Sequence, residues 1–284
     1  MGGVLELSDI SWCAQYIGGV FLVDVLAKLF WRQLVFLVVV GGLFNSNAAQ
    51  AGACPSSDYN LTTQAEVNAF PQNCDHVTGN LKVQGAQITN LAPLEDVQTV
   101  GADLYIKNND SLATLNGLSS VTSVGAQLYI SYNTLLTDIS ALANLTTVGS
   151  DLYIRDNDSL ATLNGLSSVT SVGAQLYISY NALLTDISAL SNLVSIGNGL
   201  YIYDNQGLSN CSALAVVLGA KKCAPQGGFI SGSLDGSVYL NSNGACNTTS
   251  EILSSYQAPS SCPVSDAVLW FILQGSNESG ETSE

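Results

Sequence analysis

Residues 111–143 read SLATLNGLSSVTSVGAQLYISYNTLLTDISALA, and the same stretch returns at 159–191 with two changes. The two copies define a 48-residue period. A shorter, 24-residue period runs through both copies and is carried by Leu115, Ile139, Leu163 and Ile187. The repeating unit is therefore a 24-residue coil, and a repeat of this length indicates a solenoid rather than a single globular core.

Apolar residues recur at seven positions of each unit, first at Leu115, Leu118, Val121, Val124, Leu128, Ile130 and Leu136. The segment Leu-Tyr-Ile begins at 104, 128, 152, 176 and 200. Leu81-Lys82-Val83 starts the same pattern, but it precedes Leu104 by one residue less than the 24-residue period. Its alternation is typical of a short strand with Leu and Ile inward and Tyr outward. We therefore expect an all-β, parallel solenoid of about six 24-residue coils.

Glycine and asparagine recur beside each predicted strand. Glycine precedes the strands at Gly125, Gly149, Gly173 and Gly197, where a residue without Cβ suits a sharp turn. Asparagine follows them at Asn109, Asn133, Asn157, Asn181 and Asn205. Stacked amides can satisfy backbone groups that a buried corner would leave unpaired, so we expect a structural asparagine ladder.

The first 51 residues are expected to be a leader with a signal peptide. Lys28 and Arg32 precede the apolar run Leu34 to Phe44, and Ala49-Gln50-Ala51 then offers a cleavage site. The run has 11 residues, whereas a membrane-spanning helix needs about 20.

Residues 1–27 fit a signal peptide poorly, so we predict a misassigned start, with translation beginning near Val25 or Leu26. The alternative is one uncleaved membrane helix from Tyr16 to Phe44, which would place three charged residues in the bilayer. On that alternative the leader would hold the protein at a membrane.

Six of the seven cysteines lie beyond the leader, as three close pairs: Cys54, Cys74, Cys211, Cys223, Cys246 and Cys262. An even set in an exported chain indicates disulfide bonds. Six cysteines allow 15 pairings, of which pairing of sequence neighbours is the simplest. A secreted or cell-surface location follows from the leader and the cysteines together.

Composition and motifs weigh against several functions. Seven Lys and Arg against 22 Asp and Glu give a net charge of −15, which opposes nucleic-acid binding. His76 is the single histidine, no CxxC is present, and no serine or cysteine sits in a nucleophile elbow, so we expect no enzyme, metal or cofactor. Lys107 and Arg155, the basic residues of the central array, leave a carbohydrate-active β-helix enzyme as the least favoured alternative.

The coil pattern L-x-x-L-x-x-V-x-x-V-G-x-x-L-x-I-x-x-N-x-x-L resembles the leucine-rich-repeat-like coil of receptor L domains, which occurs in receptors and in fungal and bacterial surface proteins. The segment 73–83, with Cys74 before Gly79-Asn80-Leu81, is similar to the N-terminal motif of that family. The resemblance implies a right-handed parallel β-helix, a disulfide between Cys54 and Cys74, and a degenerate last coil followed by a capping helix at Ser250 to Tyr256.

The predicted organisation is a cap at 52–80, solenoid repeats at 81–222, a degenerate coil with C-terminal cap at 223–262, and a flexible tail at 263–284. We expect a non-catalytic recognition or adhesion module for a glycan or surface protein. The candidate contact residues are the outward tyrosines Tyr105, Tyr129, Tyr153, Tyr177 and Tyr201. The alternatives are tyrosines that only stabilise the sheet and a structural envelope protein without a ligand.

Overall fold

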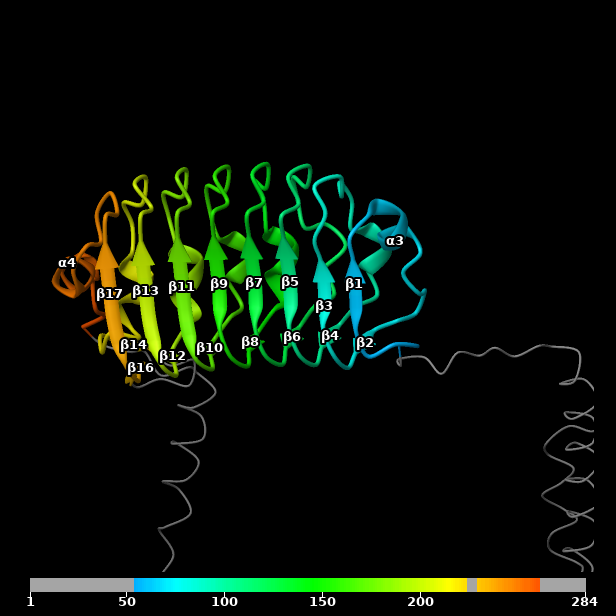
Figure 1. Ribbon diagram of the computed structural model, residues 1–284. Coiled ribbons are helices and arrows are strands. Elements are labelled where there is room, and N and C mark those ends of the chain that lie inside the picture. The colour runs from blue at the N-terminus through cyan, green and yellow to red at the C-terminus, as the bar shows by residue number, and fades with distance from the viewer. Residues whose placement is uncertain (1–53, 224–228, 261–284) are drawn as a thin grey trace, which may run out of the picture. The chain divides into compact units, whose positions relative to one another are not determined.

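The computed structural model describes residues 54–223 and 229–260 (Figure 1). The expected leader at 1–51, the tail at 263–284 and Cys262 lie outside the described residues. No helix within the described ranges has the length and apolar character needed to cross a membrane.

Two parallel sheets run along the molecule (Figure 1). The sequence predicts the parallel stacking and most strands of the larger sheet, but not the second sheet. The larger has eight strands in the order β1 (Tyr59–Leu61), β3 (Leu81–Val83), β5 (Leu104–Lys107), β7 (Leu128–Ser131), β9 (Leu152–Arg155), β11 (Gln175–Ser179), β13 (Gly199–Tyr203) and β17 (Ser237–Asn241). The smaller has seven strands in the order β16 (Ser233–Leu234), β12 (Ser195–Ile196), β10 (Ser171–Val172), β8 (Thr147–Val148), β6 (Ser123–Val124), β4 (Thr99–Val100) and β2 (His76–Val77).

Short helices complete the coils. The 3₁₀ helices are η1 (Ala92–Leu94), η2 (Ser140–Asn144), η3 (Asn164–Leu166), η4 (Ser188–Asn192) and η5 (Ser212–Ala215). Two α-helices, α3 (Gln64–Asn68) and α4 (Thr249–Ser255), lie at opposite ends of the described solenoid (Figure 1). Each α-helix begins with a capping box, formed by Thr63 with Glu66 and by Thr248 with Glu251.

The strand register reproduces the 24-residue period. Leu128, Tyr129 and Ile130 of β7 pair with the equivalent Leu, Tyr and Ile of β9, one coil later, and the same holds from β5 to β13. The inward Leu and Ile rows are completely buried, and together with the Val rows they form one continuous core. Removing this apolar surface from water is the main force that holds the coils together.

The glycines before the strands are needed because neighbouring coils approach closely. A Cβ atom on Gly149 would lie 2.0 Å from the backbone oxygen of Gly125, and one on Gly173 would lie 2.0 Å from that of Gly149. Neither glycine has a positive φ. The sharp turn that we expected at these positions is therefore not the reason for glycine, and contact between coils is.

The five expected asparagines are fully buried and form a ladder. In each, Nδ2 donates to a backbone oxygen of the preceding coil and to Oδ1 of the next asparagine, as Asn133 does to Ile106 and Asn157. Asn243, which the sequence did not indicate, adds a sixth member at the C-terminal end, since Asn205 donates to its Oδ1 at 3.2 Å. The ladder pairs polar groups that would otherwise be buried without partners.

The last complete coil is longer than the others. Asn205 and Asn243 occupy equivalent places but are 38 residues apart, and the extra residues include an antiparallel hairpin of β14 (Lys221–Cys223) and β15 (Phe229–Ser231). Ser237–Asn241, which we expected in a degenerate last coil, pairs with β13 in register as β17. The expected capping helix is present as α4.

Two disulfides are present among the described residues, and one of them corrects the sequential pairing. Cys54 bonds to Cys74, as the family resemblance implies. Cys211 bonds to Cys246 rather than to Cys223, which also excludes a bond between Cys246 and Cys262. The reason is the solenoid itself, because buried Cys211 takes the place of the inward Ile of one coil and buried Cys246, shortly after Asn243, takes the place of an inward Leu of the next.

Candidate binding face

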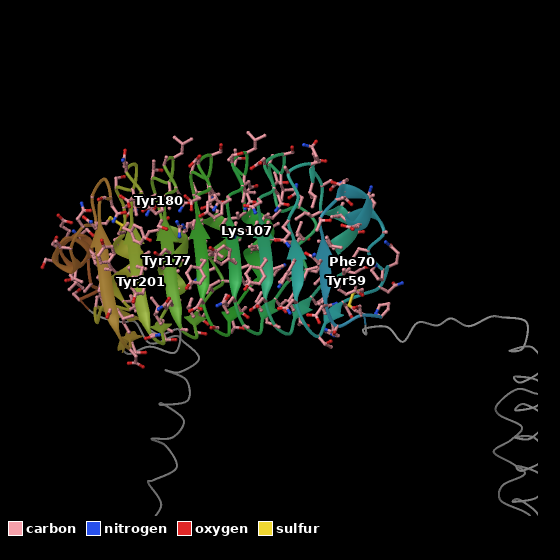
Figure 2. All side chains as sticks on the ribbon, in the orientation of Figure 1. Tyr59, Phe70, Lys107, Tyr177, Tyr180 and Tyr201 are labelled. Atoms are coloured by element: carbon pink, nitrogen blue, oxygen red, sulfur yellow. A yellow bond between two sulfur atoms is a disulfide. The ribbon has the colours of Figure 1, made fainter. Side chains whose placement is uncertain are left out.

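The outer face of the eight-stranded sheet carries the five predicted tyrosines in a row. Successive ring centroids are 5.6, 5.1, 5.2 and 5.5 Å apart from Tyr105 to Tyr201, and every ring is half-buried. Figure 2 shows Tyr177 and Tyr201 of this tyrosine ladder lying over the strands. Contacts of this kind stabilise a sheet, and they also hold the rings in fixed positions for a ligand.

Three of the five ladder tyrosines form a hydrogen bond within the protein through their hydroxyl group. Tyr105 donates to Gln127 Oε1 at 2.9 Å, and Tyr153 donates to Gln175 Oε1 at 3.1 Å. The Tyr177 hydroxyl is hydrogen-bonded to that of Tyr203. Burial raises the pKa of Tyr105 and Tyr153, and a nearby carboxylate raises it further. These two hydroxyls therefore stay neutral over the physiological pH range.

A chain of carboxylates and amides runs along the edge where the strands begin. Asp103 accepts from the Gln127 backbone at 3.0 Å, Gln127 Nε2 donates to Asp151 at 2.9 Å, and Asp151 accepts from the Gln175 backbone at 2.9 Å. Asp103 and Asp151 are thus held as hydrogen-bond acceptors inside the structure. In the described residues no group of three or more His, Cys, Asp and Glu side chains could hold a metal ion.

A second row lies beside the ladder, toward the loops that leave the strands. Lys107 Nζ lies 5.4 Å from the centroid of the Tyr132 ring. Arg155 lies between two rings, with its Cζ 5.9 Å from the centroid of Tyr132 and 5.3 Å from that of Tyr180. Tyr180 in turn meets Tyr203 edge-on at 5.4 Å. Cations and aromatic rings therefore alternate along this row, an arrangement that orients both kinds of side chain.

Small and long residues also alternate at the end of each strand. Ser131 and Ser179 are completely buried beneath their neighbours, whereas Lys107 and Arg155 at the equivalent places reach the surface. The hydroxyl oxygens of both serines lack a hydrogen-bond partner among the described residues. The long side chains and the tyrosines of the second row thus cover positions where a short residue leaves space.

The two most exposed large apolar side chains of the described residues, Leu135 and Leu183, lie in the loops after β7 and β11, each with an exposed tyrosine. Tyr132 and Leu135 are 38% and 54% exposed, and Tyr180 and Leu183 are 41% and 58% exposed. Figure 2 shows Tyr180 nearer to the loops than Tyr177. Our sequence analysis missed these four residues because they fall outside the 24-residue consensus, although the 48-residue period contains both pairs.

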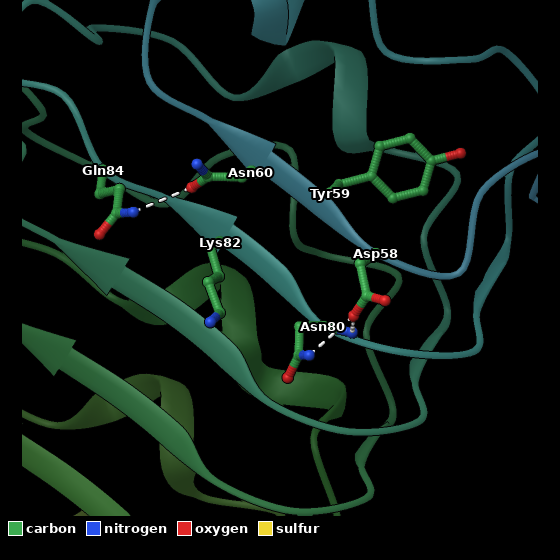
Figure 3. Close-up of a pocket in the computed structure, with 6 residues that line it drawn as sticks. All are labelled: Asp58, Tyr59, Asn60, Asn80, Lys82 and Gln84. Atoms are coloured by element: carbon green, nitrogen blue, oxygen red, sulfur yellow. Dashed lines mark hydrogen bonds between the residues drawn. The ribbon is translucent and has the colours of Figure 1, made fainter.

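The tyrosine row ends in a polar hollow of about 350 Å³ at β1 and β3 (Figure 3). Lys82 occupies the place of the ladder tyrosines and stands over the Tyr105 ring at 5.2 Å. Gln84 donates to Asn60 at 2.9 Å. Two hydrogen bonds from Asn80 lower the pKa of Asp58, so this wall of the hollow carries a negative charge.

We compared the chain with family models, curated proteins and solved structures, and none of the three comparisons found a match.

Proposed function

We propose that this chain is a non-catalytic recognition or adhesion module of the secreted or cell-surface type, which binds a glycan or a protein through its tyrosine-bearing face. The observation that carries the proposal is the gathering of tyrosines and cations on one face. Nine of the eleven tyrosines in the described residues lie there or in the adjoining loops. Tyrosine and arginine are the residues that recognition surfaces favour.

The basic residues reinforce this choice of face. Lys82, Lys107 and Arg155 all lie on it, although the chain carries an excess of acidic residues. The remaining cations of the described residues, Lys221 and Lys222, belong to β14, outside the eight-stranded sheet. A ligand along the face would meet aromatic rings, cations and, at β1 and β3, the polar hollow.

Export and family remain part of the proposal. The two disulfides suit an oxidising compartment, and the signal peptide rests on the sequence of the leader. The coil pattern supports a right-handed solenoid of the receptor L-domain kind, because parallel strands joined by crossovers favour that hand. The fold by itself implies no ligand.

A structural envelope protein without a ligand is the second candidate. It is favoured by the ladder hydroxyls, since Tyr105, Tyr153 and Tyr177 already bond within the protein. A side chain whose polar group is satisfied internally stabilises the sheet without any partner. The two candidates differ in whether the face binds anything.

The test is binding of the purified protein to a glycan panel and to native cell surfaces, with release of unsaturated sugars measured in parallel. We expect Tyr153→Ser with Tyr177→Ser to abolish binding, and Thr147→Ala with Ser195→Ala on the other sheet to leave it unchanged, with circular dichroism verifying both folds. Unchanged binding in the tyrosine variant would exclude the face as contact surface. No binding by the wild type would favour the structural role, and sugar release would favour an enzyme.

A further inference from the structure

The loops that leave the large sheet form a row along one edge of the solenoid (Figure 1). We call this row the rim. The loops after β7 and β11 present two matching apolar pairs, Tyr132 with Leu135 and Tyr180 with Leu183. The strands that carry the pairs are two positions apart in the sheet, which separates the pairs by about 10 Å.

An ion pair lies between the two apolar pairs. Arg155 Nε and Asp156 Oδ2 are 2.6 Å apart at the end of β9, and the guanidinium group touches the tyrosine on each side. The order of side chains along the rim is therefore symmetric about β9 over these three coils: an apolar pair, an ion pair and a second apolar pair.

Beyond one apolar pair lies Lys107, at the end of β5, and beyond the other lies Asp204, after β13, so the two flanking charges are opposite. Lys107 of β5 has no carboxylate within ion-pair distance among the described residues and rests on the rings of Tyr129 and Tyr132. Asp204, after β13, lies near the Tyr180 hydroxyl. β5 and β13 are four strand spacings apart, about 19 Å, so these two residues do not meet within one chain.

We infer that the rim is the contact surface between two copies of this chain, arranged antiparallel about a two-fold axis at β9. The axis brings Tyr132 and Leu135 of one copy against Tyr180 and Leu183 of the other. It also places Lys107 opposite the second copy's Asp204. Such a surface is self-complementary, as a closed two-fold dimer requires.

The sequence of the neighbouring coils supports a contact role for the exposed leucines. One coil before Leu135 and Leu183, the equivalent places hold Ser111 and Ser159. The fold therefore accepts serine there, and an aliphatic side chain more than half exposed adds little to the stability of the monomer. Burying both leucines against a second copy would stabilise the dimer, which explains why leucine stands at these two places.

The dimer goes beyond the proposed function, because it uses the loops, with Lys107 and Arg155 at the ends of their strands, and leaves the tyrosine ladder itself free for a ligand. The surface buried between the two copies is that of a few loops, so we expect a weak, concentration-dependent association.

The first experiment is sedimentation velocity of the purified chain over increasing concentration. We expect the wild type to approach twice the monomer mass, and Leu135→Ser with Leu183→Ser to weaken the dimer at least about tenfold. Leu253→Ser removes an exposed leucine of α4 and is the matched control, which should dimerise normally. A wild type that stays monomeric, or a double variant that dimerises as well as the wild type, would overturn the inference.

The second experiment exchanges the two flanking charges. Lys107→Asp alone and Asp204→Lys alone should each weaken the dimer, and the two together should restore it. Restoration identifies contact between copies, since the residues are too far apart to compensate within one chain. If the combined variant is weaker than both single variants, the antiparallel arrangement is wrong. Ligand binding by the Leu135→Ser, Leu183→Ser variant, which keeps the tyrosine ladder and its cations, would separate a failure of the dimer from a failure of the proposed function.

Discussion

Each buried asparagine connects three coils through its side chain. Asn157 Nδ2 donates to the Ile130 oxygen at 3.0 Å and to Asn181 Oδ1 at 3.4 Å, while its Oδ1 accepts from the Asn133 backbone at 3.3 Å. Only Asn and Gln offer two donors and an acceptor in one planar amide, and Asn holds that amide on the shorter stem. The ladder is therefore a chain of mutually dependent hydrogen bonds at the corner of every coil.

We predict that Asn157→Ala lowers the free energy of unfolding by about 2–4 kcal/mol, because it removes the bonds to the Ile130 oxygen and to Asn181 and leaves the Asn133 N–H buried without its partner. The measurement is urea denaturation followed by circular dichroism. Asn144→Ala is the control, since exposed Asn144 makes one hydrogen bond to the Ser119 oxygen and should cost at most about 1 kcal/mol. Equal losses in the two variants would show that the ladder has no special role.

The ladder tyrosines make the stability sensitive to high pH. Burial raises the pKa of Tyr105, Tyr153 and Tyr177 above the ordinary value of 10.0. A folded pKa above the unfolded one stabilises the fold fully below pH 10.0, and this contribution is lost as the pH rises through the folded pKa. We predict a fall in melting temperature above about pH 10 that is smaller when all three are replaced by Phe. An identical fall in that variant would contradict the prediction.

At the scale of the element, the long C-terminal coil depends on its disulfide. Cys211 and Cys246 are 35 residues apart and close a loop that includes the β14–β15 hairpin. We predict that replacing both by Ser lowers the free energy of unfolding by about 3–4 kcal/mol, the loop-closure entropy for this length. Urea denaturation measures the loss. A peptide map without reduction should recover the Cys211–Cys246 link, and a Cys211–Cys223 link would contradict the structure.

The sequence predicted the elements that obey the repeat and missed those that depart from it. The strands of the larger sheet from β3 to β13 follow from the inward Leu and Ile, because one period fixes which side chains are buried. The two-residue strands of the smaller sheet were not predicted. β1 escaped notice, since Tyr59-Asn60-Leu61 lacks the Leu-Tyr-Ile pattern. The disulfide of the last coil was mispredicted because a 38-residue step between equivalent asparagines is not visible before the ladder is seen.

The candidate site was predicted in part for a similar reason. The outward tyrosines of the strands follow from their alternation, and the structure places them side by side. Tyr132 and Tyr180 occupy the left-handed region with φ of 54° and 56°, which is rare for a bulky residue and which no apolar pattern indicates. Their recurrence with the 48-residue period was the one signal in the sequence.

At the scale of the whole molecule, each described coil is stabilised through its neighbours. Solenoids of this kind gain stability from the contact between adjacent units, and the end units need caps. Here α3 and α4, with the disulfides near each of them, occupy the two ends. The chain thus advances by one strand spacing for each coil.

The most direct test is a set of spin-label distances along the outer face of the seven-stranded sheet. A spin-labelled residue at His76 is combined with one at Thr147, Ser195 or Ser233, which lie three, five and six strand spacings away. We predict backbone separations of about 14, 24 and 29 Å, at ~4.8 Å per spacing. Distances that fail to increase in proportion to the number of strands would contradict the stacked parallel solenoid.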